Sequence, residues 1–333
     1  MENIRIREMQ LTLRNEREML ADFLIQHKLH IDEDVECAFG VFQGEALCGC
    51  GCAAGSTLKC FAIDESLRGQ NVLGMLISHL SAERFTTGYD DLFVFTRPHN
   101  RELFAGCGMY PLCETESVLL LENRRGGVER FARSVSAAPE GVRDIGAAVM
   151  NCNPLTNGHL SLIRYAAAHS EFLYVFVVEE NRSAFPFADR IALVRKATKD
   201  MPNVCVQPSG KYMISGATFP TYFLKETESP SKIQSELDIT LFAGQIAPAL
   251  HIGKRFAGQE PFDAVTHEYN ETMRRLLPQY GIEFCEIPRA ALDGEVISAG
   301  RVRALLRERG MCSEIERMVP ACTAEYLRDR ESV

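Results

Sequence analysis

The order of apolar and polar positions divides the chain into two stretches with different patterns. Up to about residue 135, short apolar runs with alternating polarity predict strands, and apolar side chains at helical spacing predict helices between them. The predicted strands cover 37–42, 46–54, 58–63, 91–96 and 117–121. The predicted helices cover 14–30, 71–85 and 99–105. This mixture is typical of an α+β domain.

From about residue 143 onwards, apolar strands alternate with helices. The predicted strands cover 145–150, 172–178, 204–207, 239–242, 251–256 and 282–287. The predicted helices cover 158–169, 187–199, 265–277 and 298–309. Such alternation predicts an α/β fold with a Rossmann-like parallel sheet and right-handed crossovers, in which ligands bind at the carboxyl ends of the strands.

The two stretches are separated by a segment with a different composition. Residues 122–143 contain two loop-like runs, Asn123–Gly127 and Ser136–Gly141, and the segment 135–143 is interpreted as the linker. We therefore expect two domains, one covering 1–138 and the other 139–333.

Composition and charge narrow the class of protein. The formal net charge is −9 and the pI is near 5.5, which argues against binding of a nucleic-acid backbone. No apolar run approaches the roughly 18–20 residues of a membrane span, and the first ten residues lack the apolar stretch of a signal peptide. We expect a cytoplasmic protein with no nucleic-acid or membrane partner, in which a local pocket can still take a small anion.

Three of the twelve cysteines are close together, at Cys48, Cys50 and Cys52. Alternate residues of a strand share one face, so the three thiols could bind a soft metal ion. A fourth ligand is not evident nearby, and a glycine-rich strand packed against a helix explains the pattern as well. No metal ligands are therefore predicted among the protein side chains, and reduced thiols are expected.

The most informative segment is Asn151–His159, which follows the predicted strand 145–150 and opens the next helix. Free N–H groups at a helix start favour anions, and Gly158 permits close approach of the backbone. Thr156 can donate a hydroxyl hydrogen bond, and His159 adds an imidazole that titrates near neutral pH. The arrangement suits a nucleotide triphosphate, although Thr156 can also act only as a helix cap.

A second segment with phosphate-binding character lies far downstream, at 297–303. Ser298 precedes a predicted helix and can cap it or bond a phosphate. Arg303 lies just inside that helix, where its planar fork can hold phosphate oxygens.

Together, the two segments resemble the nucleotidyltransferase superfamily that carries a His-x-Gly-His or Thr-x-Gly-His signature, here Thr156–His159. Its downstream Ile-Ser-Ser-Thr-x-x-Arg motif is partly kept in 297–303, where Ala299 and Gly300 replace the second Ser and the Thr. The resemblance implies a Rossmann-related fold and attack on the α-phosphate of a nucleotide with release of pyrophosphate.

A narrower resemblance covers nearly the whole chain and points to the [citrate (pro-3S)-lyase] ligase family. Its most specific part is the Thr-Phe-Pro-x-Tyr-Phe-Leu-Lys string, which is not a general nucleotide motif, although a buried aromatic cluster would explain some of it. The segments that carry this resemblance are Asn151–His159, Ala217–Lys225, Ile246–Leu250, Gly258–Pro261, Ile287–Arg289 and Ile297–Arg303.

The first domain resembles the GNAT acetyltransferase fold in Leu67–Asn71 and Asn100–Tyr110. Working GNAT enzymes hold the coenzyme A pyrophosphate with a glycine-containing loop. Here Asn71 and Leu73 stand at the glycine positions, and their side chains would crowd that approach. Two interpretations of this domain are therefore kept: it is a docking or packing domain, or it binds a coenzyme.

The resemblance implies a reaction in which ATP, with Mg²⁺, and acetate acetylate a thiol through acetyl-adenylate. The thiol belongs to the coenzyme A-like prosthetic group of the acyl carrier (gamma) subunit of citrate lyase. The resemblance implies catalytic roles for His159, Thr156 and Arg303, and substrate binding by Tyr222 and Lys225. The nucleotide-binding residues that it implies are Asn153, Gly158, His159, Gly258, Glu260, Ser298 and Arg303.

Three alternative functions use the same sequence features. The first is an adenylyltransferase for a small phosphorylated metabolite, which needs both phosphate-binding segments but no carrier. The second is a GNAT-type acetyltransferase or acetyl-CoA sensor with a regulatory second domain. The third is the equivalent ligase for the carrier of malonate decarboxylase.

Overall fold

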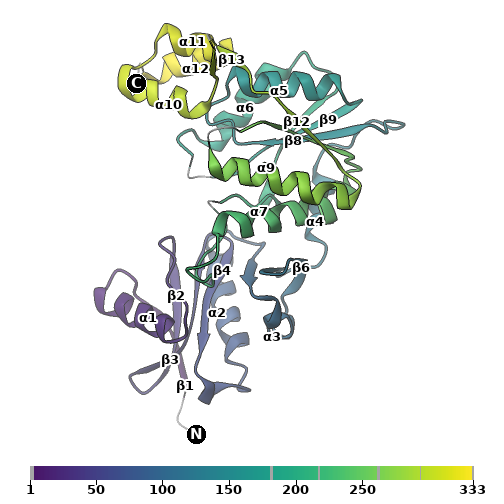
Figure 1. Ribbon diagram of the computed structural model, residues 1–333. Coiled ribbons are helices and arrows are strands. Elements are labelled where there is room, and N and C mark those ends of the chain that lie inside the picture. The colour runs from purple at the N-terminus through teal and green to yellow at the C-terminus, as the bar shows by residue number, and fades with distance from the viewer. Residues whose placement is uncertain (1–3, 181–182, 217, 261–262, 293, 332–333) are drawn as a thin grey trace. The chain divides into compact units, whose positions relative to one another are not determined.

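The computed structural model describes residues 4–180, 183–216, 218–260, 263–292 and 294–331 (Figure 1). The chain forms two compact units. The first unit comprises Met1–Gly127 together with Phe219–Ile233, and the second comprises Val128–Thr218 together with Gln234–Val333. The chain therefore leaves the second unit, contributes a segment to the first, and returns.

The first unit is built on a seven-stranded sheet with the order β1-β2-β3-β4-β5-β7-β6. Neighbouring strands are antiparallel, except that β4 and β5 are parallel. The strands are β1 (Ile4–Met9), β2 (Cys37–Gln43), β3 (Ala46–Ala54), β4 (Thr57–Ile63), β5 (Phe93–Thr96), β6 (Tyr110–Glu114) and β7 (Leu119–Glu122). The α-helices are α1 (Arg14–Gln26), α2 (Val72–Thr86) and α3 (Arg101–Ala105). Helix α4 (Gly127–Ser134) follows and belongs to the second unit from Val128 onwards.

Helix α2 packs on this sheet through an apolar stripe. Ile77 and Leu80 belong to a buried cluster with Leu58 and Val94 of the central strands, so the parallel pair β4/β5 lies under the helix. The thiols of Cys50 and Cys52 on β3 are fully buried. All twelve cysteines are free, and the described residues contain no group of three or more His, Cys, Asp or Glu that could hold a metal ion.

The segment Phe219–Ile233 is an integral part of the first unit. The Tyr222 hydroxyl donates a 2.9 Å hydrogen bond to the backbone carbonyl of Phe95 on β5, and the Tyr222 ring is buried. Arg97 Nη1 donates to Glu228 Oε1 at 3.0 Å, and Nη2 donates to Glu228 Oε2 at 2.5 Å. An aromatic cluster and a forked ion pair thus hold the segment against the end of β5.

The second unit contains a five-stranded parallel sheet with the order β10-β9-β8-β11-β12. Figure 1 shows α5 and α6 on one face of this sheet and α9 on the other. The strands are β8 (Ile145–Met150), β9 (Phe172–Val177), β10 (Val204–Pro208), β11 (Lys254–Gly258) and β12 (Glu283–Ile287), with a small hairpin of β13 (Ala291–Leu292) and β14 (Glu295–Val296). The α-helices are α5 (Asn157–Ala168), α6 (Phe187–Thr198), α7 (Pro230–Leu241), α8 (Ala247–Ala249), α9 (Ala264–Leu276), α10 (Ala299–Arg309), α11 (Ser313–Met318) and α12 (Ala321–Glu331).

The strand order places a topological switch point between β8 and β11. Strand β9 lies on one side of β8, whereas β11, which follows much later in the chain, lies on the other. Connections therefore run in opposite directions from this point and open a crevice outside the carboxyl ends of the strands. Asn151 directly follows β8, and Gly258 is the last residue of β11, so the first predicted phosphate-binding segment begins at this crevice.

The α/β fold class predicted from the sequence is confirmed, with an α+β first part and a parallel-sheet second part. The strand predicted at 239–242 is wrong, because these residues continue α7 into a π-helical turn, Phe242–Ile246. Ile239, Leu241 and Phe242 are buried there, and a short apolar run does not distinguish a buried helix from a strand. The loop predicted through 122–143 contains α4. No helix of the described part of the chain is long and apolar enough to cross a membrane.

Candidate active site

A cavity of about 1100 Å³ in the second unit lies at the crevice between β8 and β11. Ligand pockets typically measure roughly 300–1000 Å³, so this one can hold a nucleotide together with a small second substrate. Most of the catalytic and nucleotide-binding residues predicted from the sequence line it, although they come from three separate segments. They are Thr156, Gly158, His159, Gly258, Glu260, Ser298 and Arg303.

The start of α5 fixes the orientation of the His159 ring. Thr156 is the N-cap, and its Oγ1 accepts a hydrogen bond from the His159 backbone N–H at 3.4 Å. In return, His159 Nδ1 accepts from the Thr156 backbone N–H at 3.1 Å and lies 2.9 Å from Thr156 Oγ1. This reciprocal arrangement is a capping box with His in the third position. The structural and functional interpretations of Thr156 are therefore compatible, because the cap is what orients the imidazole.

The same hydrogen bonds assign the tautomer of His159. Because Nδ1 accepts from a backbone N–H, it carries no proton, and in the neutral ring the proton is on Nε2. Burial, with a smaller contribution from the charge of Arg289, lowers the pKa of His159 to about 4. The ring is therefore neutral at pH 7 and offers Nε2–H as a hydrogen-bond donor rather than a positive charge.

The two segments predicted to bind phosphate are in direct contact. Arg303 Nη1 on α10 donates a 2.5 Å hydrogen bond to the backbone carbonyl of Asn153, in the loop after β8. A Cβ atom at Gly158 would lie 3.2 Å from the carbonyl oxygen of Ile297, which is tighter than usual contact. Gly158 therefore lets the start of α5 approach the backbone that precedes α10. Asn153 itself does not line the cavity, and it acts through this carbonyl.

The start of α10 presents polar groups to the cavity. Ser298 is the N-cap, and its Oγ accepts from the Arg301 backbone N–H at 3.1 Å. Gly300 lies between two polar groups of this helix start. A Cβ atom at Gly300 would lie 3.9 Å from both Arg303 Nη2 and Ser298 Oγ, so the absence of a side chain there leaves space beside these two groups. The cavity thus has two helix N-termini, α5 and α10, on adjacent segments, which is an arrangement suited to anionic oxygens.

Glu260 and Gly258 have structural partners of their own in this cavity. Glu260 is buried and forms an ion pair with Arg289, whose Nε also donates to the Gln259 carbonyl at 2.7 Å. The Gly258 carbonyl accepts from Asn270 Nδ2 at 2.9 Å. Ala217 and Pro261, which end two of the segments carrying the family resemblance, lie outside the described residues.

Tyr222 and Lys225 are not among the residues that line this cavity. Both belong to the first unit, where the Tyr222 hydroxyl is engaged with Phe95. Burial raises the pKa of Tyr222 well above its ordinary value, so the hydroxyl keeps its proton and its role as a donor. The Lys225 side chain is exposed, and its backbone N–H donates to Glu228 Oε2 at 2.7 Å.

Arg190 is a buried residue beside the crevice that the sequence analysis did not single out. It is fully buried, and its guanidinium donates to four backbone carbonyls, those of Asn151, Val178, Glu180 and Phe185, and to Asn151 Oδ1 at 2.6 Å. These oxygens follow β8 and β9, so Arg190 holds the floor of the crevice in place. The sequence does not indicate this role, because the partners of Arg190 are mainly backbone carbonyls, which any residue type can supply.

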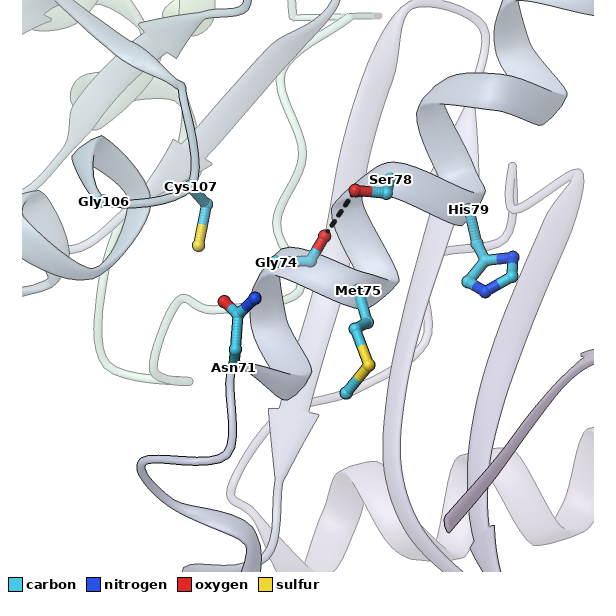
Figure 2. Close-up of a pocket in the computed structure, with 7 residues that line it drawn as sticks. All are labelled: Asn71, Gly74, Met75, Ser78, His79, Gly106 and Cys107. Carbon is cyan, nitrogen blue, oxygen red and sulfur yellow. Dashed lines mark hydrogen bonds between the residues drawn. The ribbon is translucent and has the colours of Figure 1, made fainter.

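The first unit has a smaller pocket of about 360 Å³ at the start of α2 (Figure 2). Asn71 has φ +57°, a left-handed conformation that glycine favours and Asn tolerates. Its side chain lies over Gly74, where a Cβ would come within 2.5 Å of Asn71 Oδ1. The crowding expected at Asn71 is therefore present, whereas Leu73 packs against the core and does not line the pocket.

Comparisons with known proteins agree with the sequence motifs. The family model of the citrate lyase ligase C-terminal domain matches residues 145–327. The [citrate [pro-3S]-lyase] ligase of Klebsiella pneumoniae is 39% identical over 316 residues, which cover 93% of this chain and 92% of that protein. The protein of the same name from Escherichia coli (strain K12) is 40% identical over 319 residues, covering 93% and 90%.

Among solved structures, an acetyltransferase of the GNAT family from Staphylococcus aureus Mu50 aligns with 36% of this chain and 98% of its own length, with 12% identity and a TM-score of 0.31. The curated relatives match far more of the chain at much higher identity. On that similarity, the protein belongs to the [citrate [pro-3S]-lyase] ligase family.

Proposed function

We propose that this chain acetylates the prosthetic-group thiol on the acyl carrier subunit of citrate lyase, using ATP and acetate. The reaction proceeds through acetyl-adenylate and releases pyrophosphate and then AMP. The observation that carries the proposal is the junction of the Thr156–His159 and Ser298–Arg303 segments in one cavity. Membership of the citrate lyase ligase family supports the choice of carrier.

The first step needs alignment rather than a protein nucleophile. Acetate is already ionised at neutral pH, so one of its oxygens attacks the α-phosphorus directly, and the bond to the bridging oxygen of pyrophosphate breaks. The protein lowers the barrier by holding the two anions in line and by stabilising the charge that grows on the phosphoryl oxygens.

His159 is the donor that we assign to the α-phosphoryl oxygens. Its ring is held by Thr156 with the proton on Nε2, so the donor is oriented before the substrate arrives. A preorganised donor of this kind costs no rearrangement during the reaction. Because the ring is neutral, it stabilises the growing charge without first binding the ATP phosphates as an ion pair.

Arg303 and Ser298 are assigned to the β- and γ-phosphates. One arm of the Arg303 guanidinium is fixed by the Asn153 carbonyl, which leaves Nη2 at the open start of α10. The Ser298 oxygen accepts from the backbone, and its O–H can still donate to a phosphate oxygen. A guanidinium and a helix N-terminus together favour the multiply charged leaving group.

Mg²⁺ is included as the partner of the ATP phosphates. It prefers oxygen ligands, keeps several waters and is usually bound through one or two carboxylates plus substrate phosphates. When bound, the ion would neutralise charge on the phosphate oxygens.

In the second step the carrier thiolate attacks the acyl carbon. The new S–C bond forms as the C–O bond to AMP breaks, so AMP retains the oxygen that acetate supplied. We assign the pocket at the start of α2 to the prosthetic arm, because its volume of about 360 Å³ suits a narrow chain even with the Asn71 side chain lying over Gly74. Lys225, exposed on the same unit, is the side chain proposed to contact the carrier.

Exchange of labelled pyrophosphate into ATP by the purified full-length chain tests this function. We expect exchange that requires acetate and does not require the carrier. Acetylation of the deacetylated carrier, with AMP release, is expected only when the carrier thiol is free. Exchange that depends on a phosphorylated metabolite such as phosphopantetheine, and not on acetate, would contradict the proposal.

A further inference from the structure

Arg255 is a buried cation in the same cavity that the proposed nucleotide contacts do not use. It lies on β11, pairs in register with Ala147 of β8 and Phe284 of β12, and is 5% exposed. Its neighbour Phe256 faces α5, with its ring 6.5 Å from that of Tyr165. Since side chains alternate along a strand, Arg255 points to the opposite face.

The surroundings of Arg255 leave part of its guanidinium without a partner. The Cζ atom lies 4.5 Å from the centre of the Phe242 ring, and Arg255 lines the cavity. Nη1 is shielded from solvent and has no hydrogen-bond partner among the described residues. Burying a charged group costs folding free energy unless an anion pairs with it, so an N–H group without a partner calls for an explanation.

Asp238, the buried acid that interacts with this guanidinium, is already engaged, and Tyr269 bonds to both side chains. Asp238 Oδ1 accepts from the Ile214 backbone N–H at 2.6 Å, and Oδ2 accepts from the Tyr269 hydroxyl at 2.5 Å. Burial raises the pKa of Asp238, with the Arg255 charge acting in the opposite sense. Asp238 is thus a fixed part of the wall, and the place beside Nη1 remains available for an anion from outside.

The depth of the site favours a small carboxylate over a triphosphate. Arg255 precedes Gly258, at the end of β11, by three residues, and hence by about 10 Å along the strand. The groups suited to the triphosphate lie at the strand ends and helix starts. Ile214, bonded to Asp238, and Met273, one helical turn from Tyr269, add apolar walls that suit a short alkyl group.

We propose that Arg255 binds the carboxylate of acetate and that Ile214 and Met273 enclose its methyl group. This inference rests on the proposed function, because it assigns the second substrate of that reaction. It makes Arg255 a specificity-determining residue for a small, singly charged acid. Longer acids meet Met273, and uncharged analogues leave the guanidinium unpaired.

The test compares the full-length chain with Arg255→Met and Arg255→Lys in acetate-dependent ATP–pyrophosphate exchange. Arg274→Met is the matched control, because Arg274 is exposed on α9 and does not line the cavity. We expect the KM for acetate to rise by at least about 10-fold in both Arg255 variants, the usual effect of losing a charged hydrogen bond. The KM for ATP should stay within about twofold.

Two further measurements keep the inference testable if Arg255→Met does not fold. Met273→Ala should increase the use of propionate relative to acetate, and a crystal of the wild-type chain soaked with acetate should show a carboxylate on Nη1. An unchanged KM for acetate contradicts the inference, and a parallel rise in the KM for ATP assigns Arg255 to phosphate instead. Absence of acetate-dependent exchange in the wild-type chain would instead contradict the proposed function itself.

Discussion

Arg303 Nη1 donates a 2.5 Å hydrogen bond to the backbone carbonyl of Asn153, 150 positions earlier in the chain. This bond connects the start of α10 to the loop after β8, and Gly158 permits the close approach beside it. One guanidinium therefore has two tasks in our account. It holds the two phosphate-binding segments together and faces the triphosphate with its other arm.

Replacing Arg303 by Lys tests these two tasks. Lys keeps the charge but lacks the planar fork, so it cannot bond the Asn153 carbonyl and a phosphate in the same geometry. We expect kcat/KM for ATP to fall by about 10²-fold in pyrophosphate exchange, close to the usual cost of a bidentate contact. Arg307→Lys, on the exposed side of the same helix, should behave as wild type. Equal losses in both variants would contradict the assignment.

Replacing His159 by Ala removes the donor assigned to the α-phosphoryl oxygens. The loss of one preorganised donor typically costs roughly 10²–10³ in rate, or about 3–4 kcal/mol. We expect pyrophosphate exchange to fall at least that far, whereas circular dichroism and the thermal midpoint should show a folded protein. Near-wild-type exchange would remove His159 from the mechanism.

The low pKa of His159 also predicts a pH dependence of stability. The folded-state pKa is about 4 and the ordinary value is 6.5, so between these values the unfolded chain binds more protons than the folded one. The free energy of unfolding is therefore highest above pH 6.5 as far as His159 is concerned. It falls by an amount on the order of 2 kcal/mol as the pH drops towards 4. Urea unfolding at pH 7 and pH 5 should give a smaller difference for His159→Ala than for the wild type.

The ion pair between Arg97 and Glu228 stabilises the first unit by holding the segment Phe219–Ile233. Hydrogen bonds from Arg97 and from the Lys225 backbone lower the pKa of Glu228 to about 2. We expect Arg97→Met to reduce the free energy of unfolding by about 1–3 kcal/mol at pH 7. Because the Glu228 pKa is depressed, this contribution is lost as the pH falls from about 4.5 through 2, so the two proteins should converge in acid. A constant difference down to pH 2 would contradict the assignment.

The pocket at the start of α2 can be filled without disturbing the second unit. Ser78 is exposed at its edge, where Oγ donates to the Gly74 carbonyl at 2.8 Å (Figure 2). We expect Ser78→Tyr to leave acetate-dependent pyrophosphate exchange unchanged and to slow acetylation of the carrier by about 10-fold or more. Thr86→Tyr, at the other end of the same helix, is the control. Equal transfer rates in the two variants would remove this pocket from the second step.

Most elements of the parallel sheet could be placed from the sequence, although the strand predicted at 251–256 lies at Lys254–Gly258. Strand 145–150 and helix 187–199 were predicted to within a residue at either end, because a continuous apolar run and helical spacing define them without help from distant residues. The error at 239–242 has a local cause, because a short apolar run does not distinguish a buried helix from a strand. The run at 239–242 is helical because it continues α7, which begins at Pro230.

The candidate site also combines residues that the sequence identifies with residues that only the structure reveals. Thr156 and His159 are recognisable from local spacing, since a capping box is a feature of four consecutive residues. Arg190 and Arg255 were not singled out, because their partners are mainly backbone carbonyls and an aromatic ring, and Arg289 was noted only as part of the Ile287–Arg289 segment, without a role. Tyr222 and Lys225 carry a specific sequence pattern, yet only the three-dimensional structure places them in the first unit.

Acetate labelled with ¹⁸O in both oxygens tests the central claim most directly. If a carboxylate oxygen attacks the α-phosphorus and the thiolate then attacks the acyl carbon, one labelled oxygen must remain on AMP. We expect mass spectrometry to find one ¹⁸O atom in each AMP formed with each acetylated carrier. AMP free of label, formed at the same rate as acetylated carrier, would contradict passage through acetyl-adenylate.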